Sequence, residues 1–371
     1  MQKKYKPFLL SPAAKDYIWG GTRLREEYHK NIDITPLAET WECSTHPDGP
    51  SVVRSGAFAG MKLGDVLRVH PEFIGTHPRV TEAGGLPVLI KFIDAARDLS
   101  VQVHPSDAYA RVHEHGQLGK TEMWYVLEAA PGASLVYGFR QDLSREQLAA
   151  ALVDGTVEKY LQKVEIHRGD VFLIEAGTVH AIGAGAMIVE IQESSNLTYR
   201  MYDYNRLGKD GKPRELHIQK ALDVVDLRKK PLPEPRKRVS EQHAGYRVEL
   251  LEQCKYFRTE RIRLATKTTD RTGMGERETS VDMTGIAVDN SAAANTREEA
   301  PRWTAAAPQG ISVTFSTDAN SFAVLLCVDG SGTLRGEDLS LSFQKGDCIF
   351  VPADSIRLAL RGQCELLKVT C

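Results

Sequence analysis

Four side chains with metal-binding atoms stand in short, strand-like stretches of the sequence. Gln102 and His104 lie two residues apart in an alternating apolar and polar run, so a strand points both to the same face. Glu122 and His180 follow in two further stretches of this kind. Two imidazoles, one carboxylate and one amide oxygen form a suitable cage for a divalent cation. We therefore expect these four residues to converge on one metal ion.

The segments around these residues are short apolar runs broken by glycine and proline, which is typical of strands and turns. Residues 86–94 form a continuous apolar run that contains a single lysine, Lys91. Residues 168–180 are expected to form a turn, a strand and a second turn that ends at a histidine. Short helices are expected at residues 62–70, 107–114, 144–152 and 215–225. The chain is therefore predicted to be mainly β, with a few short helices.

The helix over residues 144–152 has the clearest start signal. Ser144 is a good N-cap, because its hydroxyl can accept a hydrogen bond from a backbone N–H of the first turn. Gln147 follows three residues later and can return a hydrogen bond to the N-cap backbone. The pair predicts a capping box.

The second half of the chain repeats one feature of the first. Residues 345–353 have the same form as residues 168–176, a Gly-Asp pair after a basic residue and then an apolar run. This self-similarity predicts a second copy of the same barrel. Three prolines among charged residues at 231–235 indicate a domain boundary, so we divide the chain into residues 1–235 and residues 236–371.

The second copy is expected to lack a metal site. Its one histidine is His243, and Ile356 and Arg357 stand near the position where a metal-binding histidine would be needed. Residues 265–310 contain few large apolar side chains, which predicts a long loop or insertion. A structural or lid role is the expectation for this half of the chain.

Composition excludes several classes of partner. A net charge of -2 and a pI near 6.6 give no basic surface for nucleic acid or for an anionic membrane. No apolar stretch approaches the length of a transmembrane helix. The six cysteines are scattered without a C-x-x-C pair, which favours reduced thiols and a cytoplasmic protein.

Four motifs in order resemble a known enzyme family. The pattern of residues 168–180 resembles the second motif of the cupin superfamily, whose small barrels bind metal at the mouth. A narrower resemblance is to the type I mannose-6-phosphate isomerases in their short bacterial form. It is carried by Ser100–Pro105, Gly119–Tyr125, Gly177–Ile182 and Tyr199–Arg206.

This resemblance extends over about residues 8–225. It implies a fold of two cupin-type jelly-roll barrels. Residues 1–235 would be the catalytic cupin domain with the metal site and the short helices. Residues 236–371 would be a degenerate cupin-like β domain without a metal site.

The resemblance also implies a ligand set and roles for other residues. It implies one Zn²⁺ per chain, with water at an open position, bound by Gln102, His104, Glu122 and His180. It carries Arg200 over as a catalytic residue and places Lys120 and Glu190 in the active cleft. It places Lys91, Ser100 and Arg206 near the phosphate of a sugar phosphate. The reaction implied is the interconversion of D-mannose 6-phosphate and D-fructose 6-phosphate.

The chemistry of this reaction agrees with the residue types. An aldose–ketose isomerisation moves a proton between C1 and C2 through a cis-enediol(ate), so negative charge develops on oxygen and a nearby cation stabilises it. Glu190 is our candidate for the base, with Lys120 or a zinc-bound water as alternatives. Arg200 stays protonated and is expected to hold the enediolate or the substrate hydroxyls. The remote phosphate needs its own cations.

Two other functions are compatible with the same metal ligands. Two histidines and a carboxylate can hold Fe(II) in a cupin oxygenase, although Gln102 and the nearby cations favour a phosphosugar. A non-catalytic cupin that binds metal and sugar is the other alternative. A binding relic is expected to have lost Arg200 and Glu190, and both are present.

Overall fold

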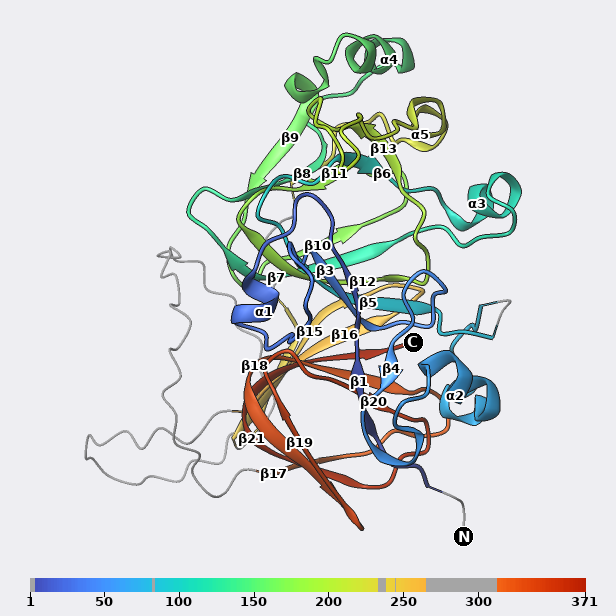
Figure 1. Cartoon of the computed structure of the whole chain (residues 1–371), viewed down its shortest axis with the longest axis vertical. Helices are drawn as coiled ribbons and strands as arrows, with labels where there is room; N and C mark the ends of the chain where they lie inside the picture. The colour runs from blue at the N-terminus through green and yellow to red at the C-terminus, as the bar shows by residue number, and fades with distance from the viewer. Residues whose placement is uncertain (1–3, 82–83, 233–237, 244, 265–311) are drawn as a thin grey trace, which may run out of the picture.

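The computed structural model describes residues 4–81, 84–232, 238–243, 245–264 and 312–371. These residues form two β barrels, with most strands of residues 88–202 in the upper part of Figure 1 and the C-terminal strands at the bottom, beside segments from the beginning of the chain. Helices are short and lie outside the sheets. The prediction of a mainly β chain with a few short helices is confirmed.

The first barrel is built from two antiparallel sheets. One sheet has the order β10 (Val171–Ile174), β7 (Glu122–Ala129), β12 (Ala186–Glu193), β5 (Val88–Asp94), β3 (Glu39–Cys43) and β2 (Ala13–Lys15). The other has the order β13 (Tyr199–Tyr202), β6 (Val101–Val103), β11 (His180–Ile182), β8 (Ser134–Phe139) and β9 (Leu161–Glu165). Strands β5 and β12 are buried along their whole length, so every charged side chain on them needs a partner inside the protein.

The helices among the described residues cover the ends of the barrels. They are α1 (Arg23–Glu26), α2 (Leu63–Val69), α3 (Asp107–His113), α4 (Arg145–Val153) and α5 (Ile218–Val224), with 3₁₀ turns η1 (Gly56–Phe58), η2 (Pro71–Phe73) and η3 (Val157–Tyr160). Helix α4 begins with the predicted capping box of Ser144 and Gln147. Helix α5 begins later than predicted, because the backbone of residues 215–217 is hydrogen-bonded to Arg200 of β13 instead.

The second barrel is a ten-stranded sheet. Its main order is β14 (Ser240–His243), β15 (Tyr246–Gln253), β16 (Arg258–Leu264), β21 (Leu358–Thr370), β18 (Ala323–Gly336), β20 (Cys348–Val351), β1 (Phe8–Ser11) and β4 (Val52–Val53). Strand β17 (Ser312–Phe315) pairs with β21, and β19 (Leu339–Gln344) pairs with β18. Two strands from the beginning of the chain thus complete this sheet. No local sequence pattern indicates this pairing.

The repeated Gly-Asp segments form the same turn in both barrels. Asp170 accepts a hydrogen bond from the backbone N–H of His167 (2.7 Å), and Asp347 accepts one from that of Gln344 (2.9 Å). The glycine before each aspartate has a positive φ, 90° at Gly169 and 93° at Gly346, a conformation that side chains resist. The predicted domain boundary after residue 235 and the predicted loop over residues 265–310 lie outside the described residues and stay predictions.

The two barrels share a hydrophobic core. Phe8 stacks on Phe350 and Phe322 stacks on Phe350, each pair with ring centroids 5.3 Å apart, and the same cluster includes Phe92 of the first barrel. Tyr125 of β7 crosses the same interface, and its hydroxyl lies 2.6 Å from a Glu365 carboxylate oxygen of β21. The second barrel therefore supports the strands of the first.

Replacement of Lys30 by methionine is expected to destabilise this interface by about 3–5 kcal/mol. Lys30 lies 2.7 Å from a Glu42 oxygen and also donates to the carbonyl of Gly346 in the second barrel. Both side chains are buried, so the variant leaves the Glu42 carboxylate without its cation. Chemical denaturation measures the loss. The double variant Lys30→Met/Glu42→Met should recover most of it, and a loss below about 1 kcal/mol for the single variant would contradict a buried pair.

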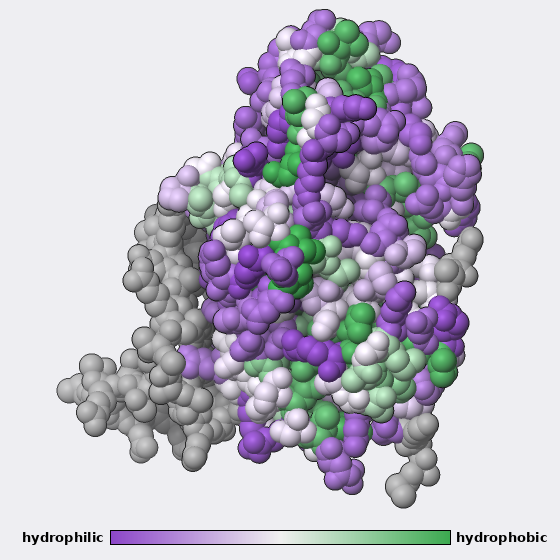
Figure 2. All heavy atoms as spheres, viewed as in Figure 1, coloured by the Kyte–Doolittle hydropathy of each residue, from purple (hydrophilic) through white to green (hydrophobic). Residues whose placement is uncertain are grey.

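The distribution of polar residues points to the interior of the first barrel. On the face in Figure 2, hydrophilic residues predominate and hydrophobic ones form small separate patches. None of the helices in the described ranges is long and apolar enough to cross a bilayer. The unusual feature is a set of ionisable side chains that are almost inaccessible: Lys91, His104, Lys120, Glu122, His180 and Glu190. Buried ionisable groups of this kind require partners or a ligand.

Candidate metal centre and active site

Strand pairing brings the predicted metal ligands to one end of the first barrel. In the five-stranded sheet, Gln102 of β6 lies opposite His180 of β11 on one side and opposite Arg200 of β13 on the other. His104 follows β6 directly, and Glu122 is the first residue of β7 in the facing sheet. The site thus lies where the two sheets approach each other.

The four side chains form a compact cluster. The Nε2 atoms of His104 and His180 are 3.0 Å apart, and each lies 3.6 Å from a Glu122 carboxylate oxygen. The Gln102 amide lies 3.3 Å from Nε2 of His180, and rotating that amide by 180° presents its oxygen to the same point. One ligand atom from each of the two histidines and the glutamate lies within 4.8 Å of the others.

The donor set suits a divalent cation. Nδ1 of His180 lies 2.8 Å from the carbonyl oxygen of Thr178, so it carries the proton and Nε2 presents its lone pair to the cluster. One oxygen of the buried Glu122 carboxylate, Oε1, accepts no hydrogen bond among the described residues and lies 3.6 Å from Nε2 of His180. An unprotonated nitrogen and an unbonded carboxylate oxygen that face one point are costly in a dry interior unless a cation binds there. The residues therefore fit the metal that the sequence predicts.

Burial sets the protonation of the two histidines. It lowers the pKa of His104 well below the usual range, and the positive charge of Lys120 lowers it further. Burial likewise lowers the pKa of His180 to about 4. Both imidazoles are therefore neutral near pH 7, which is the form that binds metals.

Lys120 and Glu190 adjoin the ligand cluster. Nζ of Lys120 lies 2.6 Å from a Glu122 oxygen, and 3.3 Å from both Nε2 of His104 and Oε1 of Glu190. Oε1 of Glu190 on β12 also lies 3.1 Å from Nζ of Lys91, which is the cross-strand partner of Glu190 on β5. Two lysines and two carboxylates thus alternate inside the barrel next to the predicted metal site.

This alternation drives the pKa values of the two carboxylates apart. Burial and the Glu190 charge raise the pKa of Glu122 to about 7. Burial also acts to raise the pKa of Glu190, but Lys120 and Lys91 outweigh it, so the net shift is downward. Glu190 is therefore ionised at neutral pH, whereas Glu122 is partly protonated.

The affinity of the metal-free protein for a divalent cation is expected to fall as the pH is lowered below 7. Protons compete with the cation for Glu122, so affinity should fall by up to about tenfold per pH unit below the pKa of Glu122 and level off above it. Calorimetric metal titrations at about pH 6 and about pH 8 measure this, together with proton release on the acidic side.

Removal of the Glu190 charge provides the control for this pH dependence. In Glu190→Gln, the pKa of Glu122 should fall, because one neighbouring negative charge is gone. The loss of metal affinity should then shift to lower pH. Equal affinity of the unmodified protein at the two pH values would contradict the competition.

The three residues predicted near a phosphate lie in different surroundings. Lys91 is buried between Glu190 and Glu39, with Nζ 3.7 Å from the latter. Ser100 is buried just before β6. Arg206 lies beyond β13, where its guanidinium donates to Asp203. Their predicted phosphate contacts stay predictions.

Arg200 lies beside the cluster at the position expected from β13. One of its terminal nitrogens donates to the carbonyl of Glu215 (2.8 Å), and its buried Nε has no hydrogen-bond partner among the described residues. Burial and the neighbouring charges of Arg214 and Arg206 lower its pKa. Three guanidinium groups at one end of the barrel favour the binding of an anion there.

Glu39 is a site residue that the sequence interpretation missed. Its carboxylate accepts a hydrogen bond from Nε1 of Trp41 (2.7 Å) and faces Lys91 from β3. The two-residue spacing of Glu39 and Trp41 on a strand was the available signal, since it places both on one face. Nothing in that spacing indicated that β3 would pair with β5 and bring them to Lys91.

The fold and the site together define a cupin-type β-barrel protein with a candidate metal site. Residues 8–125 match the family model of the type I phosphomannose isomerase catalytic domain, and residues 309–371 match that of the mannose-6-phosphate isomerase cupin domain. The expectation of two cupin-type barrels is confirmed.

Named relatives agree with the family models. The chain is 30% identical to a putative mannose-6-phosphate isomerase of Bacillus subtilis over 97% of its own length and 98% of the relative. It is 37% identical to the mannose-6-phosphate isomerase ManA of the same organism over 68% and 78% of the two chains. The crystal structure of the mannose 6-phosphate isomerase from Bacillus subtilis superposes with a TM-score of 0.79 at 29% identity, covering 98% and 99% of the two chains. The chain belongs to the type I mannose-6-phosphate isomerase family, as the sequence motifs predict.

Proposed function

We propose that this chain interconverts D-mannose 6-phosphate and D-fructose 6-phosphate through a cis-enediol(ate) intermediate. The observation that carries the proposal is the cluster of His104, Glu122 and His180 in direct contact with Lys120, within a chain of this family. Metal ligands beside an ionised carboxylate and two cations meet the needs of a reaction that moves a proton and builds negative charge on oxygen.

We propose Zn²⁺ as the metal, one per chain, with Gln102, His104, Glu122 and His180 as ligands. Zinc accepts mixed nitrogen and oxygen ligands and takes no part in redox chemistry. When bound, it would supply Lewis-acid stabilisation of the developing negative charge.

Glu190 is the base in this proposal. Its Oε2 accepts a hydrogen bond from Nε1 of Trp124 (3.1 Å), whereas its Oε1 faces the ammonium groups of Lys91 (3.1 Å) and Lys120 (3.3 Å). This carboxylate would take the proton from C2 of the aldose and return it to C1 of the enediolate, which gives the ketose. The lowered pKa keeps the carboxylate ionised at neutral pH, which is the form that accepts a proton.

Lys120 and Arg200 complete the proposed mechanism. Lys120, 3.3 Å from Glu190, would hold and pass the proton that moves between the two substrate oxygens. Arg200 keeps its proton throughout and would donate hydrogen bonds to the enediolate. The unbonded Nε of Arg200 is available for such a contact.

The contacts of the cluster distinguish this function from the two alternatives. An Fe(II) oxygenase leaves ligand positions open for dioxygen, whereas Gln102 joins the ligand cluster and Lys120 lies against Glu122. A non-catalytic binding protein has no need for a carboxylate base. Glu190 is held there by two buried lysines.

A coupled assay for fructose 6-phosphate tests the proposal. The purified chain, stripped of metal and reloaded with Zn²⁺, should convert mannose 6-phosphate, and the metal-free protein should not. Metal analysis before and after stripping provides the control. A zinc-loaded protein that binds mannose 6-phosphate without turnover would favour the binding alternative. The same assay tests whether a sugar phosphate is the substrate. The cytoplasmic location stays a prediction.

A further inference from the structure

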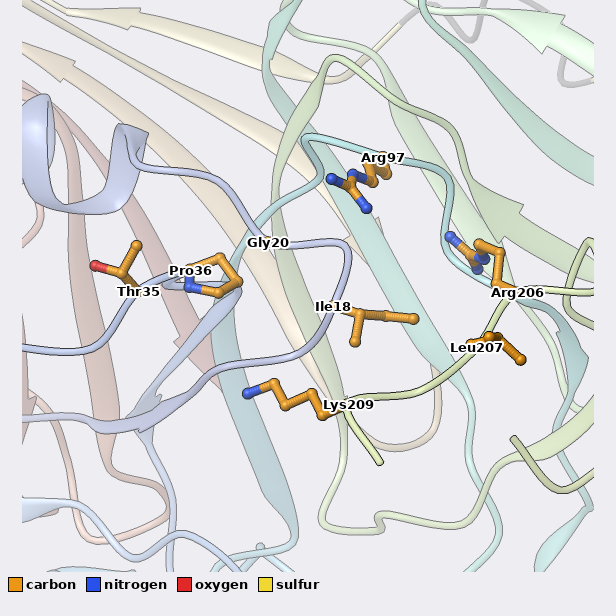
Figure 3. A pocket seen from close by; sticks show the side chains of 8 residues that line it. All are labelled: Ile18, Gly20, Thr35, Pro36, Arg97, Arg206, Leu207 and Lys209. Atoms are coloured by element: carbon orange, nitrogen blue, oxygen red, sulfur yellow. The ribbon is translucent and has the colours of Figure 1, made fainter. Parts of the chain in front are cut away.

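A hollow of about 530 Å³ opens at the end of the first barrel where β6 begins and β13 ends. Three cationic side chains line it, Arg97, Arg206 and Lys209. In Figure 3, Arg97 and Arg206 lie on one side of Ile18 and Lys209 lies on the other. None of the residues given a role so far, apart from Arg206, belongs to this hollow.

Strand register places the hollow beside the two strands that carry Gln102 and Arg200. Tyr202 of β13 is paired with Val101 of β6, so the segments outside these two residues leave the sheet side by side. Arg97 precedes β6 and Arg206 follows β13, and a terminal nitrogen of Arg206 donates to the carbonyl of Asp98. Arg97 is five residues from the ligand Gln102, a separation of at most roughly 18 Å along the chain.

The backbone holds Arg97 against the opposite wall. The N–H groups of Ala96 and Arg97 both donate to the carbonyl of Trp19, at 3.0 and 3.1 Å. Gly20, in the same wall, donates to the carbonyl of Tyr17 (3.0 Å) and closes a turn. The arginine is thus placed by a fixed loop.

The charges around the hollow do not balance. Asp203 pairs with both Arg206 and Arg214, and Asp16 pairs with Lys209. In the part of the chain that the structure describes, the Arg97 guanidinium has neither a hydrogen bond nor an ion pair.

A further acid at this end is Asp98. It accepts a hydrogen bond from the backbone N–H of Ala184 (2.7 Å), and no ion pair with it occurs within the described ranges. The guanidinium of Arg97 is thus the cation of the hollow that is exposed and that no carboxylate of the described residues pairs with.

We propose that this hollow is the binding site for the 6-phosphate of the substrate, and that Arg97 is a specificity-determining residue that binds the phosphate directly. A phosphate monoester carries about -1.5 to -2 charges at pH 7 and has three acceptor oxygens. An arginine fork matches two of those oxygens, and a free fork gives up no existing ion pair when it binds. The inference rests on the proposed function, because it assigns the substrate's remote group.

The surroundings of Arg97 support this assignment over the other two cations. Arg206 is already fixed by Asp203 and by the Asp98 carbonyl, so it contributes charge from a set position. Lys209 is already paired with Asp16. The apolar side chains of Ile18 and Leu207 also line the hollow, so its polar groups are mainly the three cations.

The test compares four zinc-loaded proteins: the unmodified chain, R97M, R97K and the control R111M. Arg111 lies on α3, is exposed, and has no side-chain hydrogen bond or ion pair within the described ranges. Steady-state kinetics with mannose 6-phosphate give KM and kcat, inorganic phosphate is titrated by calorimetry, and metal content is measured. R97M should raise KM and weaken phosphate binding by at least about tenfold, with a smaller change in kcat.

The remaining outcomes separate this inference from the proposed function. R97K should restore part of the phosphate affinity, and R111M should match the unmodified chain. If the unmodified chain turns over and R97M keeps its KM and phosphate affinity, only the phosphate assignment is overturned. A loss of kcat and zinc in R97M would also overturn it, since that indicates a structural role. An unmodified, zinc-loaded chain without turnover overturns the proposed function and this inference together.

Discussion

Replacement of His104 by alanine is expected to abolish both metal binding and turnover. Its Nε2 lies 3.0 Å from that of His180 and 3.6 Å from Glu122, so the variant removes one corner of the cluster. It also removes a neutral group next to Lys120, which then faces only the carboxylates of Glu122 and Glu190. Because a metal supplies several kcal/mol of charge stabilisation, kcat/KM should fall by at least about a thousandfold.

Metal analysis and the coupled assay measure the two losses on the same sample. His113→Ala is the matched control, because His113 is an exposed histidine on α3. It should keep both metal and turnover. A His104→Ala protein that retains stoichiometric metal and full activity would remove His104 from the ligand set.

Replacement of Arg200 by alanine is expected to leave metal binding intact and lower kcat by at least about a hundredfold, the scale of one lost electrostatic contact in the transition state. Arg200 is the strand partner of Gln102, yet its guanidinium is bonded to the carbonyl of Glu215 and not to a ligand. Metal binding is therefore expected to be independent of Arg200, whereas the stabilisation of the developing enediolate charge depends on it.

Two further variants make this prediction sharp. Arg200→Lys keeps the charge but loses the planar fork, so it should recover only a part of kcat. Arg140→Ala removes an exposed arginine outside the site and should behave as the unmodified chain. A kcat within about threefold of normal in Arg200→Ala, with substrate saturating, would place Arg200 outside the chemistry.

The sequence by itself determined the features that depend on local pattern. The alternation around Gln102 and His104 defined the short strand β6, which carries Gln102 and which His104 follows directly. The capping box at Ser144 defined the start of α4 within one residue. The Gly-Asp pairs defined two equivalent turns, because glycine readily adopts the positive φ of about 90° that each turn needs. The predicted metal ligands came from motifs of this kind, taken together.

Tertiary structure alone decided which strands are neighbours, and therefore which charges meet. Strand β1 pairs with β20 across more than three hundred residues, a contact with no local signal. The sequence predicts that Lys91 contacts a phosphate. Strands β3 and β12 flank its strand and place the carboxylates of Glu39 and Glu190 against it, which the sequence did not indicate. Arg97 belongs to no motif in the sequence. It became a candidate for phosphate binding only because its loop lies next to the segment after β13 in the structure. A side chain's chemistry depends on its neighbours in space, and those are set by the long-range pairing of strands.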